Sequence, residues 1–138
     1  MNELKIVGNK DTCTAAVIIN DTKILLGLRH YNSSNWKAIS VWTTPGGRCE
    51  EGEVLETNLR REVLEETGIS ELEITKFLGK VPGAKDGDVL YVFLCTTNQQ
   101  PTLTEPDKFS EWKWCNLTEL PVNFINPHIA ELLKTLGR

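Results

Sequence analysis

The segment from Gly47 to Ile69, GRCEEGEVLETNLRREVLEETGI, constrains the fold more than any other part of the chain. Its leucines and valines recur at helical spacing, which predicts an amphipathic helix over residues 54–67. Gly68 follows at the position where a helix end favours left-handed backbone. The segment therefore predicts one helix that buries a narrow apolar stripe of Leu55, Leu59 and Val63.

The acidic residues of this predicted helix do not lie where a solubilising surface would place them. Glu62, Glu65 and Glu66 follow i, i+3, i+4 spacing and therefore share one face. At about 100° per residue, that face lies beside the apolar stripe. Like charges at this spacing repel, and the carboxyl end of a helix disfavours anions. The arrangement favours a bound cation, and an ordinary acidic surface helix is the alternative.

The residues before the helix strengthen the cation hypothesis. Pro45-Gly46-Gly47 and Gly52 allow sharp turns and a close backbone approach to a ligand. Hard divalent cations bind clustered carboxylate oxygens, and Mg²⁺ combines a few carboxylates with substrate phosphates. A glycine turn that leads into a glutamate-lined helix therefore predicts a loop–helix metal site.

Short β-rich runs on both sides of the helix predict a sheet. The runs 14–19 and 22–28 are separated by Asn20-Asp21 and predict a hairpin. Further strands are expected over 72–78, 88–97 and 111–115. The polar stretch RHYNSSNWKAISVWTTPGG predicts a long loop.

The chain closes with a second predicted helix, INPHIAELLK. Asn126 is its expected N-cap, Pro127 suits the first helical position, and Ile129, Leu132, Leu133 and Leu136 form one apolar stripe. These elements predict a single mixed α/β (α+β) domain over residues 1–138, with helices packed on a sheet.

Composition limits the classes of partner. A net charge of −4 offers no polyanion-binding surface, so we expect no nucleic-acid partner, and a phosphate-rich ligand would need local arginines or a metal. No apolar run reaches membrane-spanning length, and four scattered cysteines favour reduced thiols, so we expect a cytoplasmic protein without a membrane partner. Whether it is a monomer or a homodimer stays open.

The same 23-residue segment also matches the motif of the Nudix hydrolase family at fixed spacing. The matching residues are Gly47, Glu53, Arg61, Glu62, Val63, Glu65, Glu66, Gly68 and Ile69. The resemblance implies the Nudix fold, a mixed β-sheet sandwiched between α-helices. It also implies hydrolysis of a nucleoside diphosphate linked to another group, with Mg²⁺ or Mn²⁺ as cofactor.

The resemblance implies roles for individual residues. Glu62, Glu65 and Glu66 would be metal ligands in the catalytic site, and the Gly46 carbonyl would be a further ligand. Arg61 would orient a carboxylate among Glu53 and these ligands. Arg29, at the end of the second predicted strand, would contact substrate phosphate beside the backbone of Gly46 and Gly47.

Small size with an intact motif most resembles the MutT-type enzymes, which convert a (deoxy)nucleoside triphosphate to the monophosphate and pyrophosphate. The proline typical of ADP-ribose hydrolases and the tyrosine typical of dinucleoside polyphosphate hydrolases are out of register, since the nearest residues are Pro82 and Tyr91. Cleavage of a nucleotide sugar and a nucleotide-binding module without hydrolysis are the alternatives.

The segment EPDKFSEWKWC resembles the acidic loop and following strand of MutT-type enzymes. Glu105 is the candidate for assisting the metal or serving as general base, with Asp107 and Glu111 as alternatives. Trp112 is a candidate for stacking on the base, although alternating aromatic residues also pack one face of a sheet. Tyr31, Trp36 and Trp42 are further candidates for lining the pocket, and His30 and His128 are expected at the surface or at a helix cap.

Overall fold

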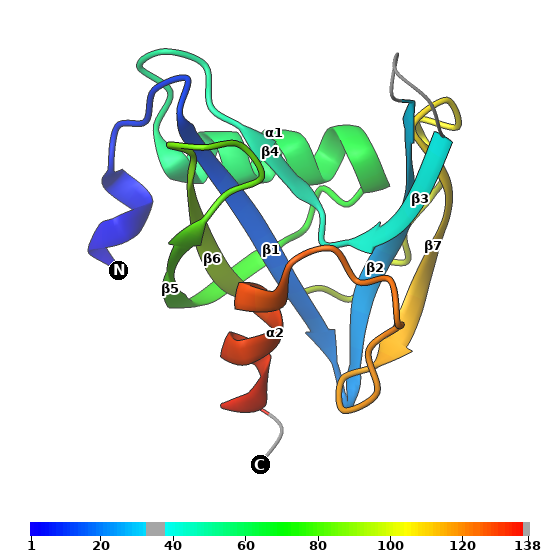
Figure 1. Ribbon diagram of the computed structural model, residues 1–138. Coiled ribbons are helices and arrows are strands. Elements are labelled where there is room, and N and C mark those ends of the chain that lie inside the picture. The colour runs from blue at the N-terminus through cyan, green and yellow to red at the C-terminus, as the bar shows by residue number, and fades with distance from the viewer. Residues whose placement is uncertain (33–37, 137–138) are drawn as a thin grey trace.

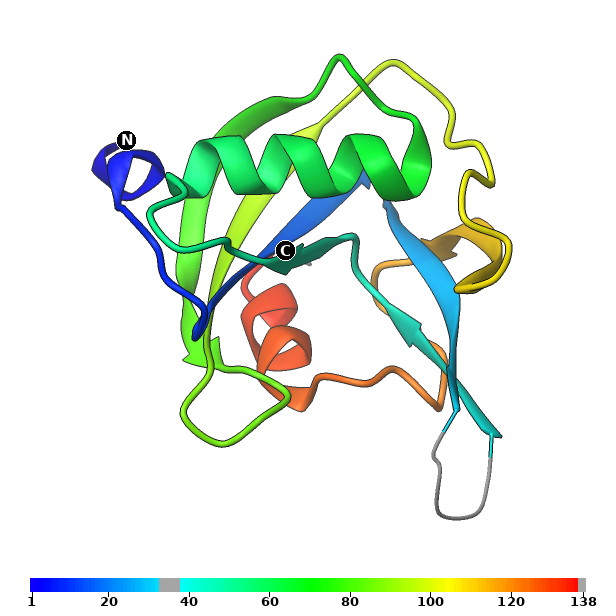
Figure 2. The same ribbon diagram turned by 90° about the horizontal axis from the view of Figure 1, so that it is seen from above.

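The computed structural model of this protein describes residues 1–32 and 38–136. A mixed sheet lies between two helices, with α1 on one face and α2 on the other (Figures 1 and 2). The strands are β1 Thr12–Asn20, β2 Lys23–Asn32, β3 Ala38–Thr43, β4 Gly46–Arg48, β5 Glu73–Pro82, β6 Val89–Thr96 and β7 Phe109–Asn116. The helices are α1 Leu55–Thr67 and α2 Pro127–Lys134, preceded by a 3-10 turn at Asn2–Lys5.

The order of the strands opens the sheet at one end. The main path is β3-β2-β1-β6-β5, with β4 also paired to β1 and β7 to β2. Strands β1 and β2 pair only through Ile19↔Ile24 and Asn20↔Lys23, beside their hairpin. Beyond that point β1 pairs with β4 while β2 pairs with β7. The sheet therefore splays into two halves, visible in Figure 1 as the V between β1 and β2.

Successive side chains of a strand point to opposite faces of the sheet, so the sheet has a hydrophobic core on each face. Ala16, Ile18 and Phe93 pack toward α1, whose Leu55, Leu59 and Val63 are fully buried as the helical stripe predicted. Val17, Val92 and their neighbours pack toward α2, against Ile129 and Leu133. The predicted arrangement of a sheet between helices is confirmed.

Both helix boundaries follow from local chemistry. Gly68 has φ 75°, in the left-handed region, and its N–H donates to Leu64 O. At α2, the side chain of Asn126 accepts hydrogen bonds from the N–H groups of His128 and Ile129. Both termini were predicted correctly because a cap depends on residues within one helical turn.

The prediction of a long loop between residues 29 and 47 was wrong. Strand β2 continues to Asn32, and β3 pairs with it through contacts such as Leu28↔Trp42 and Arg29↔Val41. Pairing with β2 makes residues 38–43 extended, although the stretch as a whole has a polar composition. The predictions for the side chains of Tyr31 and Trp36 lie outside the part of the chain that the structure describes.

Two other features bear on the earlier expectations. All four cysteines are free thiols. Within residues 1–32 and 38–136, neither helix is long and apolar enough to cross a membrane.

Candidate active site

Arg61 ties together three of the acidic residues of the motif. Its Nε and Nη2 donate to the two Glu53 oxygens at 2.8 and 3.0 Å, while Nη1 donates to Glu62 and Glu65, each at 2.8 Å. Hydrogen bonding from Arg61 lowers the pKa of Glu53 to about 2, so this carboxylate is ionised. Arg61 therefore contacts Glu53 and two predicted metal ligands, Glu62 and Glu65.

Glu66 lies in a different environment at the last turn of α1. It is 4% exposed, and its Oε1 accepts a hydrogen bond from Gly46 N–H at 2.9 Å. The Arg29 guanidinium is 3.9 Å from its other oxygen. Burial raises the pKa of Glu66 to about 8, and the Gly46 hydrogen bond opposes this only in part. The charge of Arg29 also favours the ionised carboxylate, but it does not offset the cost of burying that charge.

Glu62 lies against the glycine turn. A Cβ added to Gly47 would collide with the Glu62 carboxylate, so glycine is required for this close approach. Burial raises the pKa of Glu62 as well, with Glu65 adding to the effect and Arg61 opposing it. Glu65 is more accessible, since its side chain is 47% exposed.

A divalent cation suits these donors. Glu62 and Glu66 are two desolvated carboxylates whose charged forms are disfavoured, and a bound cation would reverse that effect. Among the described residues, no group of three acidic, histidine or cysteine side chains is already arranged around one point. Arg61 Nη1 donates to oxygens of both Glu62 and Glu65.

The structure reveals a buried amide that sequence reasoning missed. Asn58 is fully buried; its Oδ1 accepts from the Thr14 hydroxyl at 2.5 Å, and its Nδ2 donates to Arg48 O and to Glu53 Oε1. The amide thus joins β1, β4 and the Arg61 cluster. A polar residue beside Leu59 on an otherwise apolar face was the available signal.

The acidic loop after β6 reaches the end of α1. Thr102 N–H donates to Thr67 O at 2.8 Å, and the Thr104 hydroxyl donates to Glu65 O at 2.5 Å. These bonds satisfy carbonyls that a helix end leaves unpaired. The charge of Glu105 contributes to the raised pKa of Glu66, and its Oε1 is buried without a hydrogen-bond partner among the described residues.

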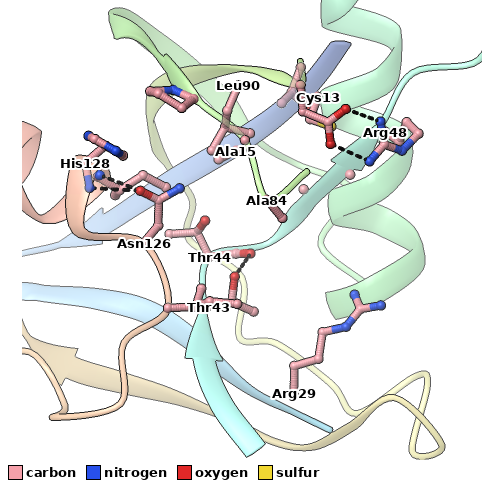
Figure 3. Close-up of a pocket in the computed structure, with 18 of the residues that line it drawn as sticks. Cys13, Ala15, Arg29, Thr43, Thr44, Arg48, Ala84, Leu90, Asn126 and His128 are labelled. Atoms are coloured by element: carbon pink, nitrogen blue, oxygen red, sulfur yellow. Dashed lines mark hydrogen bonds and ion pairs between the residues drawn. The ribbon is translucent and has the colours of Figure 1, made fainter. Parts of the chain in front are cut away.

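A cleft of about 540 Å³ extends from this acidic end between the splayed halves of the sheet. Its lining includes Arg29, Thr44, Gly46, Gly47 and Glu66, together with Arg48, Leu90, Phe109, Asn126 and His128. Figure 3 shows Arg29 at one edge, Arg48 at another, and Asn126 and His128 opposite them, with Ala15 and Leu90 between. The sequence identified the acidic end, whereas Arg48, Asp88 and the start of α2 were missed.

Trp112 occupies the sheet face instead of the cleft. It packs against the core that contains α1, and its ring lies 4.6 Å from that of Phe109. Phe109 lines the cleft and Trp112 is not among the described lining residues. The placement favours the packing interpretation over base stacking, because Gly27 leaves space for the indole on β2.

Comparisons with known proteins agree with this geometry. The NUDIX domain model matches residues 10–136. The chain is 35% identical over 121 residues to putative nudix hydrolase 1 of Caenorhabditis elegans, covering 83% of this chain and 31% of that protein. It is 30% identical over 130 residues to an RNA pyrophosphohydrolase of Pelagibacter ubique, covering 78% of this chain and 79% of that protein.

A solved structure extends the similarity to three dimensions. The MutT NUDIX hydrolase from Burkholderia pseudomallei superposes with a TM-score of 0.71 at 26% identity, over 89% of this chain and 95% of that one. The family match spans most of the chain, and two of the motif residues, Gly47 and Glu66, line the cleft. The chain therefore belongs to the NUDIX domain family and is a Nudix hydrolase of the MutT-like type.

Proposed function

We propose that this enzyme hydrolyses a (deoxy)nucleoside triphosphate to the nucleoside monophosphate and pyrophosphate, with Mg²⁺ or Mn²⁺ as cofactor. The observation that carries the proposal is the cleft itself, with buried Glu66 and Arg29 at one end and an apolar lining beyond them. Its volume of about 540 Å³ is in the range of clefts that enclose small ligands.

The two ends of the cleft suit the two parts of a nucleotide. Arg29 lines the cleft beside Glu66, where its guanidinium offers donors to phosphate oxygens. When bound, a divalent cation supplies positive charge to the phosphate oxygens and lowers the pKa of a coordinated water. Ala15 and Leu90 provide apolar surface for the nucleoside.

The reaction adds one water across a phosphoanhydride bond, so one proton must leave the attacking water. Glu105 is our candidate acceptor, because its Oε1 is buried, is without a hydrogen-bond partner in the described part of the chain, and is close enough to Glu66 to influence its pKa. In this proposal Glu62, Glu65 and Glu66 would hold the cation, with the Gly46 carbonyl as a further ligand.

A second candidate substrate is RNA that carries a 5′-triphosphate. It is favoured by the similarity to an RNA pyrophosphohydrolase of Pelagibacter ubique. The net charge of −4 argues against it, since nucleic-acid binding usually depends on a basic surface. We therefore place a free nucleotide first.

The test is product analysis with a panel of nucleoside triphosphates, oxidised purine nucleotides, a nucleotide sugar and 5′-triphosphorylated RNA, each with Mg²⁺. We expect pyrophosphate and a nucleoside monophosphate from at least one free triphosphate. In ¹⁸O-labelled water, attack at the β-phosphorus would place the label in pyrophosphate. Cleavage of the RNA or the nucleotide sugar alone would contradict the triphosphate proposal, and binding of nucleotides without any cleavage would contradict hydrolysis.

A further inference from the structure

The cleft has a second end, which the strand register locates. Gly46 pairs with Ala15 across β4 and β1, and Arg48 pairs with Cys13 two residues further along. At about 3.3 Å per residue, these two pairs lie roughly 7 Å apart. Glu66 accepts a hydrogen bond from Gly46 N–H, so Gly46 marks the acidic end of the cleft. Arg48, two residues further along β4, marks the second end.

The row of residues at this second end is apolar. Cys13 pairs with Leu90 on β6, and Leu90 pairs with Val81 on β5. Cys13, Leu90 and the adjacent Ala84 all line the cleft. In Figure 3, Leu90 and Ala15 lie between His128 on one side and Arg48 on the other. Such a surface fits the flat apolar face of a nucleobase better than it fits a phosphate.

An ion pair closes this end. Arg48 Nη1 and Nη2 donate to the two oxygens of Asp88 at 2.9 and 2.7 Å, and Nη1 also donates to Lys10 O at 2.7 Å. This two-bond geometry is the strong, directional form of an arginine–carboxylate contact. The Asp88 side chain is 4% exposed. Because its donors face Asp88 and Lys10, Arg48 is a wall of the cleft and not a phosphate ligand.

Asp88 also holds the connection between β5 and β6. Its carbonyl accepts from Gly83 N–H and its own N–H donates to Lys85 O, each at 3.0 Å, while Lys85 N–H donates to its carboxylate at 3.3 Å. Gly83 and Ala84 in this connection line the cleft. The ion pair thus attaches a cleft-lining loop to β4, across from the start of α2.

We propose that the Arg48–Asp88 ion pair forms the end wall of a nucleoside subsite and determines which bases fit there. The proposal rests on the function proposed above. Arg48 and Asp88 act as positioning residues: they fix the loop at 83–88, and the loop with Cys13 and Leu90 contacts the base. Loosening the pair should weaken binding of the nucleoside without altering binding of the polyphosphate.

The experiment compares Asp88→Asn, Arg48→Met and the double variant with the wild type. We measure KM and kcat for several nucleoside triphosphates, and the inhibition constant of inorganic triphosphate, which lacks a nucleoside. A charged hydrogen-bonded pair supports an effect of roughly tenfold, so we expect KM to rise about tenfold in each single variant with kcat little changed. The inhibition constant of inorganic triphosphate should stay the same. The differences in KM between nucleoside triphosphates with different bases should become smaller.

Two comparisons distinguish a specific role of the Arg48–Asp88 pair in the nucleoside subsite from a general loss of structure. Glu56→Gln breaks the Arg60–Glu56 pair, an arginine–carboxylate contact on the exposed side of α1, and should leave every constant unchanged. The double variant should be no worse than the worse single variant, because both remove one interaction. Unchanged nucleotide KM values, additive effects, or a parallel rise in the inhibition constant of inorganic triphosphate would each overturn the proposal.

Failure of the proposed hydrolysis would be recognised separately. If the wild type cleaves no nucleotide, calorimetry with nucleoside monophosphates and with inorganic phosphate tests the subsite directly. If Asp88→Asn weakens binding of nucleoside monophosphates but not of inorganic phosphate, the proposed role of the ion pair is supported. Equal affinities in the variant and the wild type contradict it.

Discussion

The two ends of the acidic motif contain the same side chain in opposite electrostatic states. Glu53 accepts four hydrogen bonds, from Arg61, Asn58 and Glu50 N–H, and its pKa is lowered to about 2. Glu66 is buried with one backbone donor and Arg29 at 3.9 Å, and burial raises its pKa to about 8. Both are glutamates on or beside one helix, so the difference arises from their surroundings.

This difference separates an orienting carboxylate from a cation-binding one. Glu53 already has its positive partner, which fixes Arg61 and through it Glu62 and Glu65. Glu66 has Arg29 at 3.9 Å, which does not offset the cost of its burial, and the site gains most when a divalent ion adds positive charge. Four predictions test this comparison, from the largest expected effect to the smallest.

The first concerns Glu66→Gln, which should lower kcat about a thousandfold because it removes a charged ligand at the reacting centre. The fold should survive, since the amide oxygen still accepts from Gly46 N–H and a neutral side chain suits this buried position. Steady-state kinetics and thermal unfolding without metal check both parts. Glu131→Gln, at an exposed pair on α2, is the control. Near-normal turnover in Glu66→Gln would show that this carboxylate is not needed.

The second concerns pH and metal-free stability. Between the unfolded pKa of about 4.3 and the folded value of about 8, the folded protein binds one more proton at Glu66 than the unfolded chain. Stability contributed by Glu66 is therefore complete below that unfolded value and is lost as pH rises through about 8, by about 5 kcal/mol in all. Glu53 acts oppositely, since its stabilisation is present above the unfolded value and is lost as pH falls toward about 2.

Urea unfolding from pH 5 to pH 9 in the presence of a chelator measures the first slope. Glu66→Gln should flatten it, and saturating Mg²⁺ should remove most of it. A slope that is identical in the wild type and in Glu66→Gln would assign the pH dependence to another group.

The third prediction concerns Arg61, the positively charged partner of Glu53. Arg61→Met should destabilise the protein by about 2 kcal/mol, because Glu53 would keep its buried position without its cation. It should also raise the pKa of Glu53 and move acid unfolding to higher pH. Denaturant unfolding at pH 7 and pH 4 checks this, with Arg60→Met as the comparison, which loses an exposed ion pair to Glu56 and a hydrogen bond to Leu72 O. Equal stability of the two variants would contradict it.

The smallest effect is expected at Thr14→Val. This change removes the hydroxyl that donates to Asn58 Oδ1 in a buried place, which should cost about 1 kcal/mol of unfolding free energy. Thr57→Val, on the exposed face of α1, should be close to neutral. If Asn58 positions Glu53, affinity for Mn²⁺ should also weaken in the folded Thr14→Val protein. An unchanged affinity would leave Asn58 a purely structural role.

Sequence reasoning was strongest where the information is local. The caps of both helices, the stripe of Leu55, Leu59 and Val63 and the hairpin at Asn20-Asp21 were predicted correctly, since each depends on residues within a few positions. It failed for residues 29–47, where β3 becomes extended by pairing with β2. It also missed Asn58 and the Arg48–Asp88 pair, whose partners are far away in the chain.

The sequence by itself determined the family, the acidic helix face and the glycine turn that faces it, because fixed spacing on one helix fixes which side chains share a face. Tertiary structure alone decided that Arg61 keeps Glu53 ionised and that burial disfavours the charged form of Glu66. It also decided where the cleft ends. Burial and charge pairing depend on strands and loops that converge from distant parts of the chain, so spacing along the sequence carries no record of them.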